Sequence, residues 1–216
     1  MSDKVEPWVF GVAPLAQTCE LAALLRRVAG LALALEADDP AVDRLIADVR
    51  AAERALSVSA PVDLAPRVGA DAGPERRAYI DHSRDIGMFN PAFPHYAIVV
   101  EGPRASGDVT FPLVFEGPPG LVHGGVLGTF FDAVVQHHNC DVGSAGKTMS
   151  MLVEYRRPTP LLIPLRFEID RDLEASKIVS QARLYDDEVL LCSATVTAVA
   201  GDPSALPEVS QRRVRP

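Results

Sequence analysis

Apolar residues near the N-terminus recur with the three- and four-residue spacing of amphipathic helices. They form two groups within residues 15–57: Leu21, Leu24, Leu25, Val28 and Leu31, then Val42, Leu45, Ile46, Val49 and Leu56. Between the groups, Asp39 and Pro40 supply a helix cap and a proline at the first helical position. The pattern predicts a helical hairpin with one apolar stripe on each helix. Each stripe needs a partner surface, either the main domain or another subunit.

From about residue 95 the pattern changes to the two-residue alternation of strands. The expected strands cover residues 97–101, 109–115, 148–155, 165–170, 178–185 and 189–199. Gly102, Pro103 and Gly107 separate the first two strands, and residues 186–188 predict a hairpin turn. In 148–155, Thr148 falls on the face opposite Met151. Such alternation predicts an antiparallel sheet with one face exposed to water.

Residues 124–139 lie between the strand groups and are apolar around most of a helical circumference. The apolar positions are Val126, Leu127, Phe130, Phe131, Val134 and Val135. One polar stripe remains at helical spacing, consisting of Gly125, Thr129, Asp132 and Gln136. The pattern therefore predicts a buried helix, and a buried aspartate is costly without partners or a function. The expected fold is α+β, with an antiparallel sheet wrapped around a central helix.

The chain divides into three expected parts. Residues 57–77 are rich in Pro, Gly, Ala and charged residues without periodicity, which is typical of a linker. We therefore expect the helical hairpin and linker in residues 1–76, the main domain in 77–200 and a tail in 201–216.

Composition narrows the function classes. The 216 residues are 48% apolar and 23% charged, as in soluble globular proteins, and no apolar run reaches the ~18 residues of a membrane span. The acidic N-terminus does not resemble a secretory signal, so a cytoplasmic protein without a membrane partner is expected. A net charge of −8 argues against nucleic acid. Cys19, Cys140 and Cys192 lack metal-ligand spacing, which predicts reduced thiols and no metal site.

Residues 120–132, with the sequence GLVHGGVLGTFFD, resemble the signature of hotdog-fold acyl-CoA thioesterases of the phenylacetate-pathway and hydroxybenzoyl-CoA types. In that family a loop ending in His-Gly-Gly opens the central helix, and an acidic residue follows two turns later. Residues 148–161 resemble the family's next strand and its exit. The resemblance covers roughly residues 80–200 and excludes the N-terminal hairpin. It implies hydrolysis of an acyl-CoA or related thioester, with the CoA moiety as part of the substrate and no separate cofactor.

The chemistry of thioester hydrolysis suits this motif. Negative charge develops on the carbonyl oxygen, and a helix N-terminus offers free N–H groups and the positive end of a dipole. The amide of Gly124 is therefore the candidate oxyanion donor, and Asp132 is the candidate general base or nucleophile. The sequence leaves both roles of Asp132 open. The alternative interpretations are structural: a turn that starts a helix, and an aspartate that hydrogen-bonds to a neighbouring subunit.

Other residues around the motif are candidates for substrate binding. His123 and Gly125 belong to the loop at the helix start, where His123 is expected to fix the loop. The resemblance implies that Thr148 holds the water or the carboxylate, although it is otherwise an ordinary strand threonine. Arg156 and Arg157 either meet the CoA phosphates, which arginine binds well, or form a solvated strand end.

One position departs from the family pattern. Many members have an Asn or Gln where this chain has Gly117. Either Asn90 or Gln136 replaces that amide, or hydrolysis is weak. A non-catalytic module that binds acyl thioesters is therefore an alternative function.

A hotdog enoyl-CoA hydratase is a further alternative. It is suggested by Asn90-Pro91 and His95, but Gly87 and Met88 stand where its acid is needed. The identity of the acyl group does not follow from the sequence.

Helix geometry predicts a site shared between two subunits. Asp132 lies eight residues after Gly124, which is ~12 Å along a helix axis. Both groups must reach one carbonyl to within ~3 Å, and on one straight helix they do not. An antiparallel second copy of the helix would bring Asp132 level with the partner's Gly124. We therefore expect a homodimer, or a dimer of dimers as the family resemblance implies.

Overall fold

The computed structural model describes residues 15–60, 85–142, 146–174 and 176–200. The predicted tail of residues 201–216 lies outside the described residues, as does most of the predicted linker of residues 57–77. Residues 57–59 are not linker, because they continue a helix. The elements in chain order are α1 (Ala16–Leu33), α2 (Pro40–Ser59), α3 (Ile86–Phe89), β1 (Tyr96–Glu101), β2 (Arg104–Thr110), η2 (Leu113–Phe115), α4 (Gly124–Val142), β3 (Gly146–Tyr155), β4 (Pro164–Glu174), β5 (Lys177–Asp186) and β6 (Val189–Ala200).

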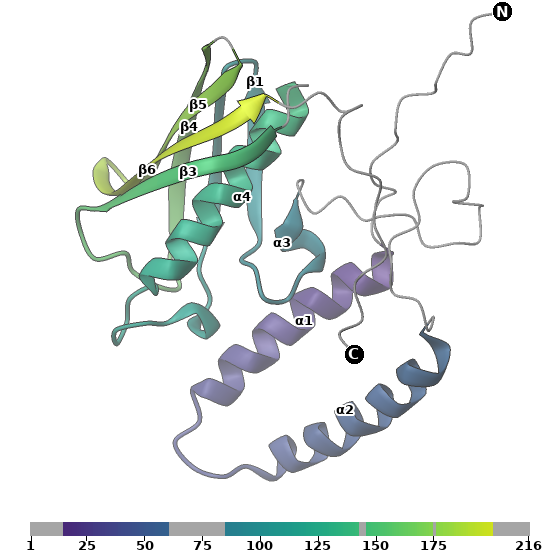
Figure 1. The fold of residues 1–216 in the computed structure, drawn as a ribbon. Coiled ribbons are helices and arrows are strands. Elements are labelled where there is room, and N and C mark those ends of the chain that lie inside the picture. Colours follow the sequence, from purple (N-terminus) through teal and green to yellow (C-terminus); the bar gives the residue numbers. More distant parts are fainter. Residues whose placement is uncertain (1–14, 61–84, 143–145, 175, 201–216) are drawn as a thin grey trace, which may run out of the picture.

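The strands form one antiparallel sheet of six in the order β1-β2-β4-β5-β6-β3. Helix α4 contacts β1, β3, β5 and β6, and Figure 1 shows the strands arranged around it. This confirms the expected α+β fold with a sheet wrapped around a central helix. The hairpin between β5 and β6 is also confirmed.

The strand boundaries differ from the prediction around β2. Gly107 was expected to separate two strands, yet it lies inside β2 opposite Ile98 and Phe167. A Cβ on Gly107 would come within 1.9 Å of the Ala97 carbonyl oxygen and 2.6 Å of the Phe167 ring, so this glycine makes room for both instead of breaking the strand. The strand ends at Thr110, before Pro112, which has no N–H for a sheet ladder. The predicted strand residues 113–115 form the 3-10 turn η2 instead.

Aromatic packing holds α4 in the sheet. Phe130 is fully buried, and its ring lies 5.4 Å from the rings of both Phe111 and Phe167 in edge-to-face contacts. Such pairs contribute ~0.5–1.5 kcal/mol each beyond their buried area. Phe131 and Val134 are fully buried beside it. The predicted burial of the apolar side of α4 is therefore confirmed.

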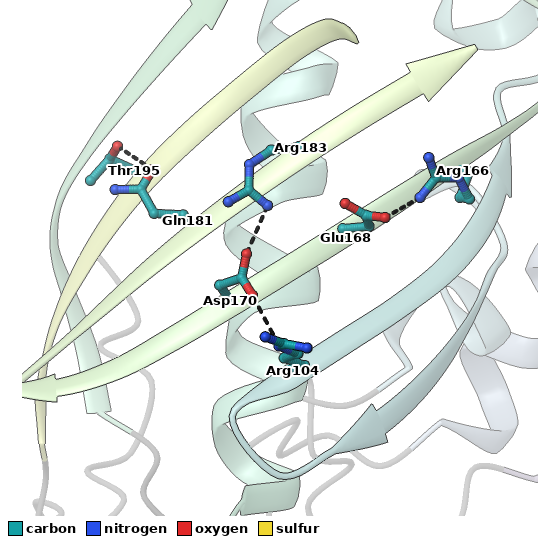
Figure 2. Close-up of polar contacts among 7 residues, drawn as sticks. All are labelled: Arg104, Arg166, Glu168, Asp170, Gln181, Arg183 and Thr195. Carbon is teal, nitrogen blue, oxygen red and sulfur yellow. Dashed lines mark hydrogen bonds and ion pairs between the residues drawn. The ribbon is translucent and has the colours of Figure 1, made fainter. Parts of the chain in front are cut away.

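The outer face of the sheet is charged. Along β4, Leu165, Phe167 and Ile169 are buried, while the alternating residues lie on the solvent face. Figure 2 shows Asp170 between Arg104 on β2 and Arg183 on β5. Exposed ion pairs of this kind contribute only ~0–1 kcal/mol each. Their main consequence is that this face stays in water, as the alternation predicted.

The two N-terminal helices form as predicted, and Asp39 caps α2 by accepting a 2.7 Å hydrogen bond from the amide of Ala41. Figure 1 shows α2 running back in the opposite direction to α1. The apolar stripes do not pack on the main domain: Leu21 is 48% exposed and Val49 is 50% exposed. Instead α1 packs on α3 and η2 through Ala22 and Arg26. Within the described residues, none of the helices is long and apolar enough to cross a membrane.

A buried histidine fixes the far end of α4. His138 is fully buried, and its Nε2 lies 2.8 Å from the carbonyl oxygen of Gly102 in the β1–β2 turn. That contact requires a hydrogen on Nε2, while the buried Nδ1 has no partner among the described residues. Burial lowers the pKa of His138, because a second proton would bring a charge into the core.

We expect His138 to make stability depend on pH. Because its pKa is lower in the folded state, the unfolded chain binds more protons as the pH falls. The stabilisation is complete above its ordinary pKa of about 6.5 and decreases below it. When the pH falls from about 7.5 to about 5.5, the melting temperature of His138→Gln should therefore decrease less than that of wild type in thermal unfolding. The exposed His95→Gln variant is the control. An unchanged pH dependence in His138→Gln would contradict this assignment.

Candidate active site at the start of α4

The loop before α4 leaves one helix amide free. The side-chain Nδ1 of His123 accepts a 3.0 Å hydrogen bond from the amide of Gly125. The carbonyl oxygen of His123 accepts from the amides of Val126 and Leu127, at 2.9 and 3.3 Å. The amide of Gly124 has no acceptor among the described residues. At a helix N-terminus such an amide is a ready donor to an anion.

Close contacts explain the glycine at the helix start. The hydroxyl of Tyr155, on β3, donates a 2.8 Å hydrogen bond to the carbonyl oxygen of Gly124. A Cβ on Gly124 would lie 3.3 Å from the Tyr155 ring, which is tighter than most such contacts. The glycine therefore lets β3 approach the first turn of α4. Tyr155 was not among the predicted site residues, because periodicity gives the face of a strand residue and not its partner.

Asp132 and Thr148 meet in the structure. The Thr148 hydroxyl on β3 donates a 2.8 Å hydrogen bond to Oδ1 of Asp132 on α4. Asp132 is half-buried, while Gly125 and Thr129 on the same stripe are exposed. The polar stripe of α4 thus lies on the side of the helix that the sheet leaves open.

The alternation predicted for β3 was wrong at Thr148. It placed Thr148 opposite Met151, yet both side chains approach α4: Thr148 at Asp132 and Met151 at Gly128. The reason is a β-bulge, since Thr148 pairs with Ala198 and Ser150 with Thr197. The extra residue, Met149, changes the face on which Thr148 lies.

Two hollows flank the helix start. One is a groove of about 240 Å³ lined by Ala92, Phe93, Pro94, Phe115, His123, Gly125, Val126 and Thr129. It is mostly apolar. The second, of about 320 Å³, is lined by Leu127, Tyr155, Arg156, Arg157, Pro158 and Thr159. The Arg156 side chain pairs with Glu154 at 3.1 Å. Both arginines are exposed at the end of β3.

The two candidate amide side chains hold local structure. Oδ1 of Asn90 accepts a 2.9 Å hydrogen bond from the amide of Ala92. Oε1 of Gln136 accepts a 3.3 Å hydrogen bond from Asn139, one turn beyond Asp132. Among the described residues, no group of three or more His, Cys, Asp or Glu side chains is arranged to hold a metal ion.

Packing explains the absence of an amide at position 117. A Cβ on Gly117 would lie 2.8 Å from the Cα of His123, so a side chain there requires a backbone shift. The loop is held tightly, because the Gly117 amide donates to the Leu121 carbonyl oxygen at 2.9 Å. The Glu116 carboxylate also accepts from the Gly120 amide at 2.7 Å. The loop conformation therefore leaves no room for an amide side chain at position 117.

We expect Gly117→Asn to displace His123 and to destabilise the fold by ~1–3 kcal/mol, the usual cost of overpacking. Urea unfolding measures the loss. Gly120→Asn is the matched control, because Gly120 has open space around its Cβ position and asparagine tolerates its positive φ of 77°. Wild-type stability in Gly117→Asn would show that the loop has room for the amide.

Comparison with known proteins places the fold. No protein-family model matches the sequence. The crystal structure of a thioesterase superfamily protein matches with a TM-score of 0.71 at 24% identity, covering 89% of this chain and 95% of that chain. This coverage extends beyond the sheet and α4 into the N-terminal helices.

Two further structures match about half of this chain. A hypothetical thioesterase from Streptococcus pneumoniae TIGR4, determined with coenzyme A, has a TM-score of 0.48 and 19% identity, over 51% of this chain and 88% of that one. The Escherichia coli PaaI protein of the phenylacetic acid degradation operon has a TM-score of 0.46 and 13% identity, over 50% and 80%. The match with a TM-score of 0.71 shows that the chain has the hotdog fold, as its His-Gly-Gly motif implied.

Proposed function

We propose that this protein hydrolyses an acyl-CoA or a related thioester at the open side of α4. The observation that carries the proposal is the pair of prepared groups on that helix. One is the Gly124 amide, which has no acceptor among the described residues. The other is Asp132, oriented by Thr148. A donor for developing negative charge and an oriented carboxylate are the two parts that the reaction needs.

The Gly124 amide acts as the oxyanion donor. It lies at the positive end of the α4 dipole, where charge developing on the thioester oxygen is stabilised. A single donor of this kind contributes ~3 kcal/mol to transition-state stabilisation. His123 supports this role by engaging the neighbouring Gly125 amide and the next two amides of the turn.

Asp132 acts on the carbonyl carbon, either directly as a nucleophile or through a water molecule as a general base. The hydrogen bond from Thr148 occupies Oδ1 and leaves Oδ2 for the reaction. The two roles differ in where solvent oxygen enters. As a nucleophile, Asp132 displaces the CoA thiolate to form a mixed anhydride, and water then hydrolyses it at either carbonyl carbon. In a single turnover in ¹⁸O-water, label in the Asp132 carboxylate therefore identifies a nucleophile whose anhydride is opened at the aspartyl carbon, whereas a general base delivers label only to the acid product.

The two hollows beside the helix start suit the two parts of the substrate. The apolar groove takes the acyl group. The hollow with Arg156 and Arg157 takes the anionic CoA portion, since arginine recognises phosphate well. Of the two, Arg157 is the stronger candidate, because Arg156 already pairs with Glu154.

A second candidate function is binding of acyl thioesters without hydrolysis. The observation that favours it is Gly117, where close packing excludes the amide side chain. The hydratase alternative is disfavoured by Gly87, because a Cβ there would lie 2.1 Å from the Pro94 carbonyl oxygen and leaves no room for an acid. Release of free thiol from a panel of CoA thioesters separates hydrolysis from binding alone.

We expect Asp132→Asn to reduce kcat by ~100-fold or more with the fold intact. Thr148→Val should cause a smaller loss of about tenfold, because the carboxylate remains but loses its orientation. Thiol release from a substrate that wild type hydrolyses is the measurement. Asp172→Asn and Thr195→Val, at positions away from α4, are the matched controls. Near-wild-type turnover in Asp132→Asn would remove Asp132 from the mechanism.

The proposed site is shared between two subunits. Gly124 and Asp132 are separated by two turns of α4 and do not reach one carbonyl within a single chain. Strand β3 lies at the edge of the sheet, where it exposes Met149, Leu152 and Tyr155. An exposed apolar edge strand favours pairing with a second copy. Antiparallel pairing there brings two α4 helices side by side and completes two sites.

Mixing two inactive variants tests the shared site. Gly124→Pro removes the amide donor at a helix position where the backbone accepts proline, and its Cβ requires the Tyr155 ring to shift by a few tenths of an ångström. Asp132→Asn removes the carboxylate. In a mixed dimer one site has both defects and the other is intact. Random re-association makes half of the dimers mixed, so activity should return to about a quarter of wild type. Mixed dimers that form and remain inactive would place each site within one chain.

A further inference from the structure

Helix α1 contacts η2, which contributes Phe115 to the apolar groove, and α3, which directly precedes the turn that forms another part of the groove wall. It packs on α3 and on η2, and its buried contacts come from Ala22 and Arg26, which are 2% and 6% exposed. Figure 1 shows α1 lying next to α3, on the side away from the sheet. Most of the remaining surface of α1 is exposed. The contact is therefore narrow and centred on Arg26.

Arg26 binds the chain between α3 and β1. Its Nη1 donates hydrogen bonds to the carbonyl oxygens of Asn90, at 2.7 Å, and Phe93, at 3.1 Å. The residues between them form a tight turn, in which the Phe93 amide donates to the Asn90 carbonyl oxygen at 3.2 Å. One guanidinium thus fixes both ends of the turn from outside.

The burial of Arg26 is costly, which makes a purely incidental contact a poor explanation. Desolvation, together with the neighbouring Arg27, lowers the pKa of the guanidinium. A buried charge is retained where it is hydrogen-bonded. Here both hydrogen-bond acceptors are main-chain carbonyls of one turn, so the interaction orders that turn rather than neutralising a charge.

The turn held by Arg26 leads directly into the groove. Ala92, Phe93 and Pro94 form one wall, and they face His123, Gly125 and Thr129 at the start of α4. Phe115, which also lines the groove, belongs to η2, the second segment that α1 contacts. Helix α1 therefore contacts the main chain of the turn that carries Phe93 and the segment that carries Phe115.

We propose that Arg26 is a positioning residue that sets the size of the acyl groove, so that α1 determines which acyl groups the site accepts. This inference rests on the proposed function, since it assigns the groove to the acyl part of a thioester. At about 240 Å³ the groove is smaller than the ~300–1,000 Å³ of typical small-molecule sites.

The test compares acyl groups of different length in Arg26→Met, which keeps the bulk of the side chain and removes both hydrogen bonds. Thioether analogues of CoA, which resist hydrolysis, carry short chains of about two to four carbons or long chains of about eight to twelve. Affinity for each is measured by calorimetry. We expect the ratio of long-chain to short-chain affinity to increase about tenfold, because the turn at residues 90–93 moves outward. Arg27→Met, at the exposed neighbouring position, is the matched control and keeps the wild-type ratio.

A second variant keeps the test decisive. The lysine of Arg26→Lys ends one bond short of the guanidinium nitrogen that makes both hydrogen bonds, so it holds the turn less tightly. It should shift the ratio partly in the same direction, and it decides alone if Arg26→Met does not fold. General destabilisation would weaken binding of all analogues equally and leave the ratio unchanged. A wild-type ratio in the folded Arg26 variants overturns the proposal.

Separate measurements of analogue binding and of thioester hydrolysis show whether the role of Arg26 or the proposed hydrolysis has failed. If wild type binds the analogues but releases no thiol from the corresponding thioesters, the proposed hydrolysis fails while the affinity ratio still tests Arg26. Where hydrolysis occurs, Arg26→Met should change KM for short acyl groups more than kcat, because Gly124, Asp132 and Thr148 are untouched. An equal loss of kcat on every substrate would assign Arg26 to the fold alone.

Discussion

The burial of α4 is the interaction on which the rest of the structure depends. Phe130 packs edge-to-face against Phe111 and Phe167, and the other apolar residues of the helix fill the space within the sheet. With so much of its circumference inside, the helix can present only one narrow face outward. That face contains Gly125, Thr129 and Asp132. Core packing thus orients the polar groups of this face, next to the helix start where the Gly124 amide has no acceptor among the described residues.

Steric restrictions then shape the region around the helix start. Gly117 packs against the main chain of His123, and Gly124 packs against the ring of Tyr155. These contacts leave no room for side chains that would otherwise fill the loop, and they bring β3 close enough to place Thr148 beside Asp132. The same tight packing excludes an amide side chain at position 117, where many members of the family that the His-Gly-Gly motif resembles carry one.

The N-terminal helices form a second layer of organisation. Helix α1 contacts the main domain through a small face centred on Arg26, while its leucine stripe and that of α2 remain largely exposed. The fold match of 89% of this chain to a thioesterase superfamily structure extends into these helices, so they belong to a known arrangement. Their contact with the turn at residues 90–93 connects a peripheral element to the wall of the central groove.

The sequence by itself determined the elements of this protein and the start of its central helix. Helical and strand periodicities, the Asp39 cap and the His-Gly-Gly motif are local signals, and they predicted α1, α2, α4, the antiparallel sheet and the fold. Tertiary structure alone decided which faces meet. A single bulge at Met149 moved Thr148 to Asp132, and the Phe167 ring turned Gly107 from a strand break into a packing position. Arg26 reaches carbonyls more than sixty residues away. Such contacts depend on register and on long-range packing, which the periodicity of a sequence does not contain.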